Sequence, residues 1–136
     1  MGKSSRTKGA TFERDIAREL FLLTGVTFKR NLEQTRQADH GDLVADDADW
    51  PFSCELKRYA SGISCLSSWK VQASKAAALC GKIPAVIFKF DRQPIRVAVP
   101  IDVLFGTSDD CRDEWAEMTL DGFAYISREM MARKNV

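Results

Sequence analysis

The sequence has little of what thiol-based metal sites and secreted folds depend on. Its 136 residues contain four cysteines, none in a Cys-x-x-Cys pair, and one histidine, His40. This pattern excludes a zinc ribbon or finger and offers no disulfide framework, so we expect reduced, mostly buried thiols. No apolar run approaches the roughly 20 residues that cross a bilayer, and the basic N-terminus lacks the apolar core of a signal peptide. We therefore expect no membrane partner and a protein that stays in the cytoplasm of a bacterial, archaeal or phage-infected cell.

The length and composition indicate one globular domain. Hydrophobic residues make up 45% of the chain and charged residues 29%, as in ordinary folded proteins. Residues 1–7 have nothing to bury, so we expect them to form a flexible basic N-terminus. Residues 8–136 are expected to form the domain, with its core in residues 8–100 and a peripheral tail in residues 101–136.

The net charge of +1 conceals an asymmetry along the chain. Residues 1–36 contain eight Lys or Arg against four Asp or Glu, whereas residues 101–136 contain four against eight. A basic front and an acidic tail favour a polyanion that approaches one side of the molecule. The alternative is a basic N-terminus that serves solubility alone.

The hydrophobic pattern predicts a mixed sheet flanked by helices, an α/β or α+β architecture. Gly and Pro mark most of the boundaries. The predicted helices are Lys8 to Gly25, Ser67 or Ser68 to Cys80, a short one at Ile101–Phe105, and Gly122–Lys134; the predicted strands are Val26–Arg30, Asp42–Ala45, Phe52–Lys57, Ile83–Phe90, Ile95–Val99 and an edge strand at Trp115–Leu120. An acidic loop is expected at Thr107–Glu114.

The stretch 41–57 is the strongest candidate for a functional site. Its two short strand patterns, separated by an acidic turn that ends in Pro51, predict a β-hairpin. Because side chains on a strand alternate between faces, Glu55 and Lys57 share one face, and Asp42 could lie a few ångströms away. Two carboxylates around a hard divalent cation, beside a lysine, suit phosphodiester hydrolysis. A hairpin whose charges simply face water is the alternative, because Glu-x-Lys alone is a common tripeptide.

Two other residues have a functional and an ordinary interpretation. Glu13 lies at the border of the buried stripe of the first helix, where it could point into a cleft or simply stabilise the helix dipole. His40 could act as a general base next to Asp42, although a single loop histidine is more often a bystander.

At this point the chain resembles the PD-(D/E)xK nuclease superfamily, and within it the small archaeal-type Holliday-junction resolvases and related phage endonucleases. The matching motifs are Lys8–Arg14 on the first helix, Gly41-Asp42-Leu43 opening a strand, Glu55-Leu56-Lys57, and Lys82-Ile83-Pro84 opening the core strand. The resemblance covers residues 8 to about 100. The family's usual Pro-Asp is Gly41-Asp42 here, a tolerable change because the aspartate is the metal ligand.

The resemblance implies a restriction-endonuclease-like fold and assigns roles to individual residues. Asp42, Glu55 and the main-chain carbonyl of Leu56 would hold Mg²⁺ or Mn²⁺, while Lys57 would orient the attacking water or stabilise the transition state. Glu13 would join through water or bind a second ion. The candidates for DNA contacts are Lys3, Arg6, Lys8, Arg30 and Arg36, together with Gln72 and Lys75 on the second helix.

The function implied is a metal-dependent, structure-selective DNA endonuclease. We expect a Holliday-junction resolvase of DNA recombination and repair, acting as a homodimer because paired cuts in a four-way junction need two-fold symmetry. One alternative is a nicking or restriction-type nuclease on linear duplex DNA. The other is a non-catalytic DNA-binding module with the same fold.

Overall fold

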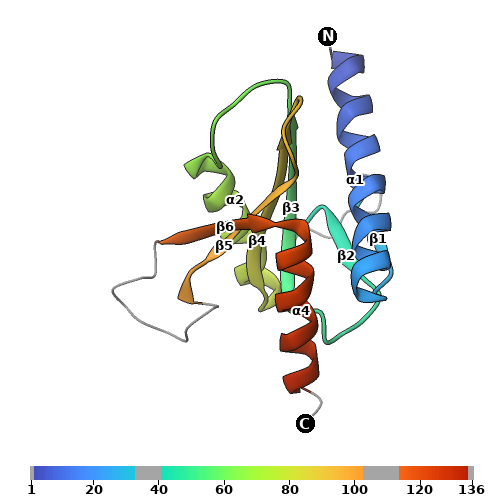
Figure 1. Ribbon diagram of the computed structural model, residues 1–136, viewed down its shortest axis with the longest axis vertical. Helices are drawn as coiled ribbons and strands as arrows, with labels where there is room; N and C mark the ends of the chain where they lie inside the picture. Colours follow the sequence, from blue (N-terminus) through green and yellow to red (C-terminus); the bar gives the residue numbers. More distant parts are fainter. Residues whose placement is uncertain (1, 33–40, 103–113, 135–136) are drawn as a thin grey trace.

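A computed structural model of the protein describes the backbone of residues 2–32, 41–102 and 114–134, and the side chains of these ranges from residue 8 onward. Along the described chain, helices are separated by groups of strands, and the strands form one sheet (Figure 1). The elements are α1 (Gly2–Thr24), β1 (Phe28–Arg30), β2 (Leu43–Ala45), β3 (Phe52–Tyr59), α2 (Ser67–Cys80), β4 (Ile83–Phe90), β5 (Arg96–Pro100), β6 (Trp115–Thr119) and α4 (Leu120–Lys134).

The six strands form a single mixed sheet in the order of the chain, from β1 to β6. Only β3 and β4 run parallel in the described part, and α2 makes the crossover between them. All other neighbours are antiparallel, including the predicted hairpin of β2 and β3, where Leu43 pairs with Cys54. The predicted mixed sheet flanked by helices is confirmed.

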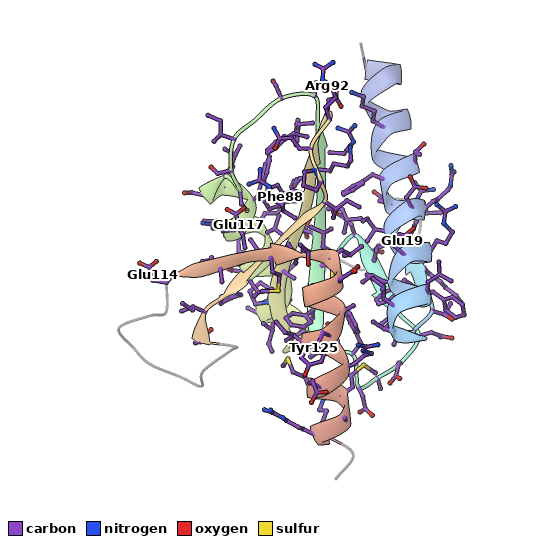
Figure 2. The ribbon with its side chains drawn as sticks, viewed as in Figure 1. Glu19, Phe88, Arg92, Glu114, Glu117 and Tyr125 are labelled. Atoms are coloured by element: carbon purple, nitrogen blue, oxygen red, sulfur yellow. The ribbon has the colours of Figure 1, made fainter. Side chains whose placement is uncertain are left out.

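Helices cover both faces of this sheet. On one face α1 and α4 pack side by side, and α2 covers β3 and β4 on the other (Figure 1). The larger core cluster lies beneath α1 and includes Ile16, Leu20, Cys54 and Leu56. The smaller cluster lies beneath α2, and Phe88 stands near its centre in the middle of the sheet (Figure 2). Burial of small residues such as Ala73 and Ala77 lets α2 approach the strands closely.

One predicted helix start and one predicted helix cap differ from the structure. Helix α1 begins at Gly2 rather than Lys8, so residues 2–7, predicted to be a flexible end, have helical backbone. No proline or strong stop signal interrupts this stretch, which lets the helix extend N-terminally. Helix α2 begins where predicted, but its N-cap is Leu66 without a side-chain cap, so neither serine performs the predicted capping. Gly81, in left-handed conformation with φ 68°, ends α2 as predicted.

The segment predicted to be a peripheral tail is part of the core over residues 114–134. Strand β6 pairs along β5 from Arg96↔Thr119 to Pro100↔Trp115. Helix α4 buries Phe123 completely, and this ring packs 4.7 Å from Phe52, between ring centroids. Composition suggested an acidic periphery, but the apolar stripe of α4 faces the sheet and leaves its acidic residues outside.

Some predictions fall on residues outside the described ranges. These are most of the short helix at Ile101–Phe105, nearly all of the acidic loop Thr107–Glu114, and the positions of Arg36 and His40. No helix in the described ranges is both long and apolar enough to cross a bilayer.

The burial of Phe123 makes a prediction about stability. We expect Phe123→Ala to lower the free energy of unfolding by about 3–5 kcal/mol, because it leaves a cavity between α4 and the sheet. The matched control is Tyr125→Ala on the same helix, where the ring is 57% exposed and the change should stay within about 0.5 kcal/mol. Urea unfolding measures both. Equal losses for the two variants would contradict a core role for α4.

Candidate active site

The centre of the site is a pair of carboxylates on neighbouring strands. The main-chain N–H of Asp42 donates to the carbonyl of Cys54 at 2.8 Å, and Leu43 is paired with Cys54 in the antiparallel register. Asp42 itself lies in the bend just before β2, and its own carbonyl accepts from Asn31, so the regular register does not continue through it. Its carboxylate reaches β3 at Leu56, the residue after Glu55. The hairpin therefore brings the carboxylate of Asp42 to β3 beside the position of Glu55.

A hydrogen bond fixes how Asp42 is oriented. Its Oδ2 accepts from the main-chain N–H of Leu56 at 2.7 Å, so the carboxylate reaches across to β3. Within an antiparallel pair, a residue's N–H and C=O face the same neighbouring strand. The carbonyl of Leu56 therefore faces the side of Asp42 as well, which is the side where a metal ligand would be needed.

The side chains of β3 alternate as predicted. In the parallel register Glu55 pairs with Val86 and Lys57 with Phe88, and both partners belong to the core cluster beneath α2. Cys54 and Leu56 belong to the opposite cluster beneath α1. Glu55 is buried, with only 2% of its surface exposed. On the other face, burial raises the pKa of the Cys54 thiol to about 12, so this thiol stays protonated at neutral pH. The site is therefore sunk into the α2 face of the sheet.

Helix α2 supports the lysine of the site. Lys57 Nζ donates to Gln72 Oε1 at 2.7 Å. Gln72 is exposed on the flank of α2, one turn after the buried Trp69. The predicted proximity of Gln72 to the site is thus explained by a direct contact that holds the ammonium group in position.

Glu13 contacts the site region through β1. Its Oε2 lies 2.8 Å from Nε of Arg30, and both side chains are about one quarter exposed, at 25% and 24%. Asn31, the residue after Arg30, donates its main-chain N–H to the carbonyl of Asp42 at 2.9 Å and its side-chain amide to the carbonyl of Gly41. Glu13 therefore holds Arg30 at the end of β1, next to Asn31, which hydrogen-bonds Asp42. The sequence did not single out Asn31, because its role depends on strand pairing.

A second charged cluster lies where β3 ends. Asp91 accepts from Lys8 Nζ at 3.3 Å and from Arg58 Nη2 at 2.6 Å. Asp91 starts the turn between β4 and β5, and Arg92 stands at its tip near the first half of α1 (Figure 2). Lys8 was predicted to contact DNA, whereas Arg58 was missed; both line the same end of the sheet.

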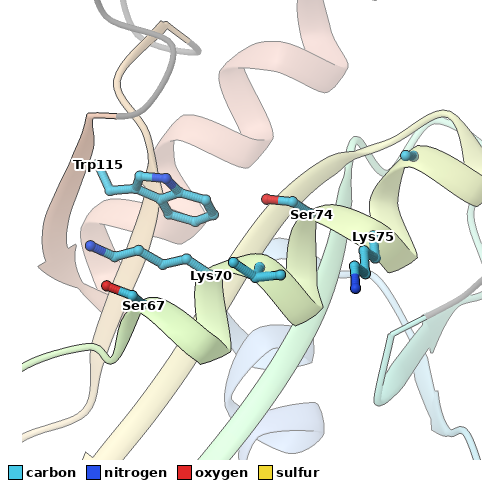
Figure 3. Close-up of a pocket in the computed structure, with 7 residues that line it drawn as sticks. Ser67, Lys70, Ser74, Lys75 and Trp115 are labelled. Atoms are coloured by element: carbon cyan, nitrogen blue, oxygen red, sulfur yellow. The ribbon is translucent and has the colours of Figure 1, made fainter.

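Lys75 lies in a groove on the outside of α2. This groove has a volume of about 580 Å³ and is lined mainly by Ser67, Lys70, Ser74 and Lys75 of the helix and by Trp115 of β6. Figure 3 shows Lys70 extended beneath Trp115, whose ring centroid is 5.9 Å from Nζ, while Lys75 projects from the other side of the helix. The side chains of Lys3, Arg6 and Arg36, also predicted to contact DNA, lie outside the described residues.

Comparison with known proteins gives the family. A family described as "Phage putative PDDEXK endonuclease" matches residues 4–130. The chain belongs to this family of PD-(D/E)xK endonucleases. No curated protein matches the chain. Among solved structures, it is similar to Hjc of Archaeoglobus fulgidus, a Holliday junction resolvase, at a TM-score of 0.56 and 18% identity, over 88% of this chain and 98% of Hjc.

The structural likeness confirms the predicted restriction-endonuclease-like fold. The family match over residues 4–130 reaches from α1 into α4, and thus includes most of the segment that the sequence resemblance could not place. Asp42, Glu55 and Lys57 are the residues that the sequence resemblance matched to the aspartate and the acidic-x-lysine triplet of the family name.

The donor set of this PD-(D/E)xK endonuclease fits a hard divalent cation. Carboxylate and carbonyl oxygens are the ligands that Mg²⁺ prefers. Asp42, Glu55 and the Leu56 carbonyl would hold it. Among the described residues no three His, Cys, Asp or Glu side chains form a metal cluster, so the set depends on two carboxylates and a main-chain oxygen.

The Lys8–Asp91–Arg58 cluster makes a prediction about pH. Hydrogen bonding to Arg58, with the further contribution of Lys8, holds the pKa of Asp91 below its ordinary value of 3.8. A carboxylate whose pKa is lowered on folding contributes stability above its ordinary pKa, and loses it as the pH falls through the folded pKa. We expect wild type to exceed Asp91→Asn in stability near neutral pH and this advantage to vanish in acid.

Urea unfolding in steps from neutral pH to below 3.8 measures this difference. Asp46→Asn, in the exposed turn between β2 and β3, serves as the control and should show no such pH-dependent advantage. A constant difference between wild type and Asp91→Asn down to the acid end would contradict the ion-pair interpretation.

Proposed function

We propose that the protein is a metal-dependent DNA endonuclease that selects branched DNA and makes two paired cuts in a four-way junction. The observation that supports this most directly is the contact of the Asp42 carboxylate with β3 at Leu56, next to Glu55, while Lys57 shares the face of Glu55 and is held by Gln72. Membership of an endonuclease family and the fold of a protein described as a Holliday junction resolvase add support.

Asp42, Glu55 and the carbonyl of Leu56 are the proposed ligands of Mg²⁺, with Mn²⁺ as a substitute. Such an ion supplies a water of lowered pKa and neutralises charge on the scissile phosphate. The hydrogen bond from Leu56 N–H to Asp42 Oδ2 holds the carboxylate of Asp42 against β3. The burial of Glu55 excludes bulk water from one side of the site, which strengthens electrostatic interactions there.

Lys57 is the proposed electrophilic group. As a compact point charge it can orient the attacking water or stabilise charge that develops on the phosphate in the transition state. Gln72 accepts one of its three donor hydrogens and leaves the ammonium charge intact, so Lys57 is positioned before DNA arrives. Glu13 contributes by holding Arg30, on the strand that supports Asp42.

Contacts between basic side chains and the DNA phosphates would supply the affinity for DNA. Lys8, Arg30 and Lys75 were proposed from sequence, and the structure adds Arg58 and Lys70 as candidates because they lie beside Lys8 and Lys75 respectively. Contacts of this kind bind phosphates without reading sequence and weaken as salt rises. Recognition of DNA shape, with two symmetric sites in a homodimer, would then select the junction.

The test is a cleavage assay with Mg²⁺, with Mn²⁺ and with EDTA. Labelled four-way junction, linear duplex and single strand are offered to wild type and to Glu55→Gln, which keeps the side-chain shape but removes its charge. We expect paired symmetric nicks in the junction, lost with EDTA and reduced at least about 100-fold by Glu55→Gln. Glu129→Gln on the exposed part of α4 is the matched control and should cut like wild type.

The outcomes separate the alternatives. Equal cutting of linear duplex would retain the active site but overturn the junction selectivity, and leave a nicking or restriction-type nuclease. Binding without cutting in either metal would overturn the enzyme assignment and leave a DNA-binding module.

A further inference from the structure

A small aromatic cavity lies two residues beyond the proposed catalytic lysine. Tyr59 is the last residue of β3, and it shares the face of Glu55 and Lys57 because strand side chains alternate. A step of two residues along a strand is about 6.6 Å, so Tyr59 stands one such step from Lys57. The cavity beside it has a volume of about 190 Å³ and is lined by Tyr59, Trp69, Phe90 and the loop residues Ser61, Gly62, Ser64 and Leu66.

The walls of this cavity are aromatic and partly preassembled. The rings of Tyr59 and Trp69 are stacked, with centroids 5.3 Å apart and planes 11° apart. Trp69 is 6% exposed and Phe90 2% exposed, so both are fixed in the core, whereas Tyr59 is 48% exposed. Tyr59 therefore has one ring face supported by the protein and substantial surface left for a further planar group.

The loop that closes the cavity is held in place. Gln93 Nε2 donates to the carbonyl of Gly62 at 3.4 Å, and Arg96 Nη2 donates to the carbonyl of Ile63 at 2.9 Å. A Cβ on Gly62 would lie 2.3 Å from the buried ring of Phe90, so only glycine permits this close approach. The loop nevertheless leaves Ile63 90% exposed and Leu66 51% exposed. Hydrogen bonds therefore hold the loop while its apolar side chains, Ile63 and Leu66, remain exposed to solvent.

The size and surroundings of the cavity indicate its occupant. A dry cavity of about 150 Å³ in another protein accommodates benzene, and sites for drug-sized molecules begin at about 300 Å³. The present cavity therefore suits one planar ring system. Arg58 and Lys8 lie at the same end of the sheet but on its α1 face, where both pair with Asp91. With Arg92 at the neighbouring turn, these four residues carry a net positive charge, which favours a polyanion at this end.

We propose that this cavity receives an unstacked nucleobase of the DNA, close to the phosphate that is cut. The base stacks on Tyr59 against the support of Trp69, and Ile63 contacts the neighbouring base that is left behind. A base at a branch point is unstacked at lower cost than a base within a continuous duplex, so the cavity favours branched over linear DNA. This inference rests on the proposed function, because it requires DNA at the active site.

The test compares the dissociation constants of junctions by fluorescence anisotropy, with Glu55→Gln as the common background so that binding is measured without cutting. Tyr59→Ala should weaken junction binding about 5- to 150-fold, the range for removing one base–aromatic stack. Tyr59→Phe keeps the ring and should restore binding to within about twofold of the background. Tyr125→Ala removes an equally exposed ring on α4 and is the matched control, with no expected change. Thermal unfolding of each variant checks that the fold is retained.

The decisive experiment removes a base from the DNA instead of the Tyr59 ring from the protein. Junctions with single abasic nucleotides are prepared at each position flanking the branch point. At one position the loss should equal that of Tyr59→Ala, and the two changes together should cost no more than either alone, because they delete the same contact. Unchanged binding by Tyr59→Ala, or losses that multiply in full at every position, would overturn the cavity's role while leaving the proposed function intact. Absence of any DNA binding in both the Glu55→Gln background and wild type would overturn both.

Discussion

The antiparallel register between β2 and β3 is the constraint on which the site depends. One hydrogen bond from Asp42 N–H to the Cys54 carbonyl and one from Leu56 N–H to Asp42 Oδ2 hold the aspartate against β3, beside the position of Glu55. A slip of one residue would turn Glu55 and Lys57 toward the core beneath α1 and Cys54 and Leu56 toward α2. The apolar side chains of Cys54 and Leu56 oppose such a slip, because they are buried against α1.

The two faces of β3 therefore have different roles, one in stability and the other in the proposed chemistry. The face toward α1 is apolar and secures the strand, and the face toward α2 presents Glu55, Lys57 and Tyr59 in succession. Helix α2 supports two of these side chains, through Gln72 for the lysine and through Trp69 for the tyrosine. A single helix can thus position both the proposed catalytic lysine and the proposed base-stacking tyrosine, because its two supporting residues lie one turn apart.

Charge is distributed in keeping with this division. Carboxylates lie in the sheet, where a cation can join them, while basic groups gather at the end of β3 and on the outside of α2. Asp91 holds Lys8 and Arg58 at that end, and its lowered pKa is the consequence of the same contacts. Helix α4, with its exposed Asp121 and Glu129, packs behind the sheet on the face opposite α2, whereas Glu117 of β6 pairs with Arg96.

Most elements and the nuclease family could be predicted from the amino-acid order. Alternating and helical patterns located β3, β4 and α2, and the ordered set of Glu13, Asp42, Glu55 and Lys57 indicated the family, because these features are local or depend on residue order alone. The three-dimensional fold was needed to show that α4 belongs to the core, that Gln72 holds Lys57 and that Asn31 donates to the carbonyl of Asp42. Those contacts join residues far apart in the chain, and their partners are set by strand register and helix packing, which no local pattern encodes.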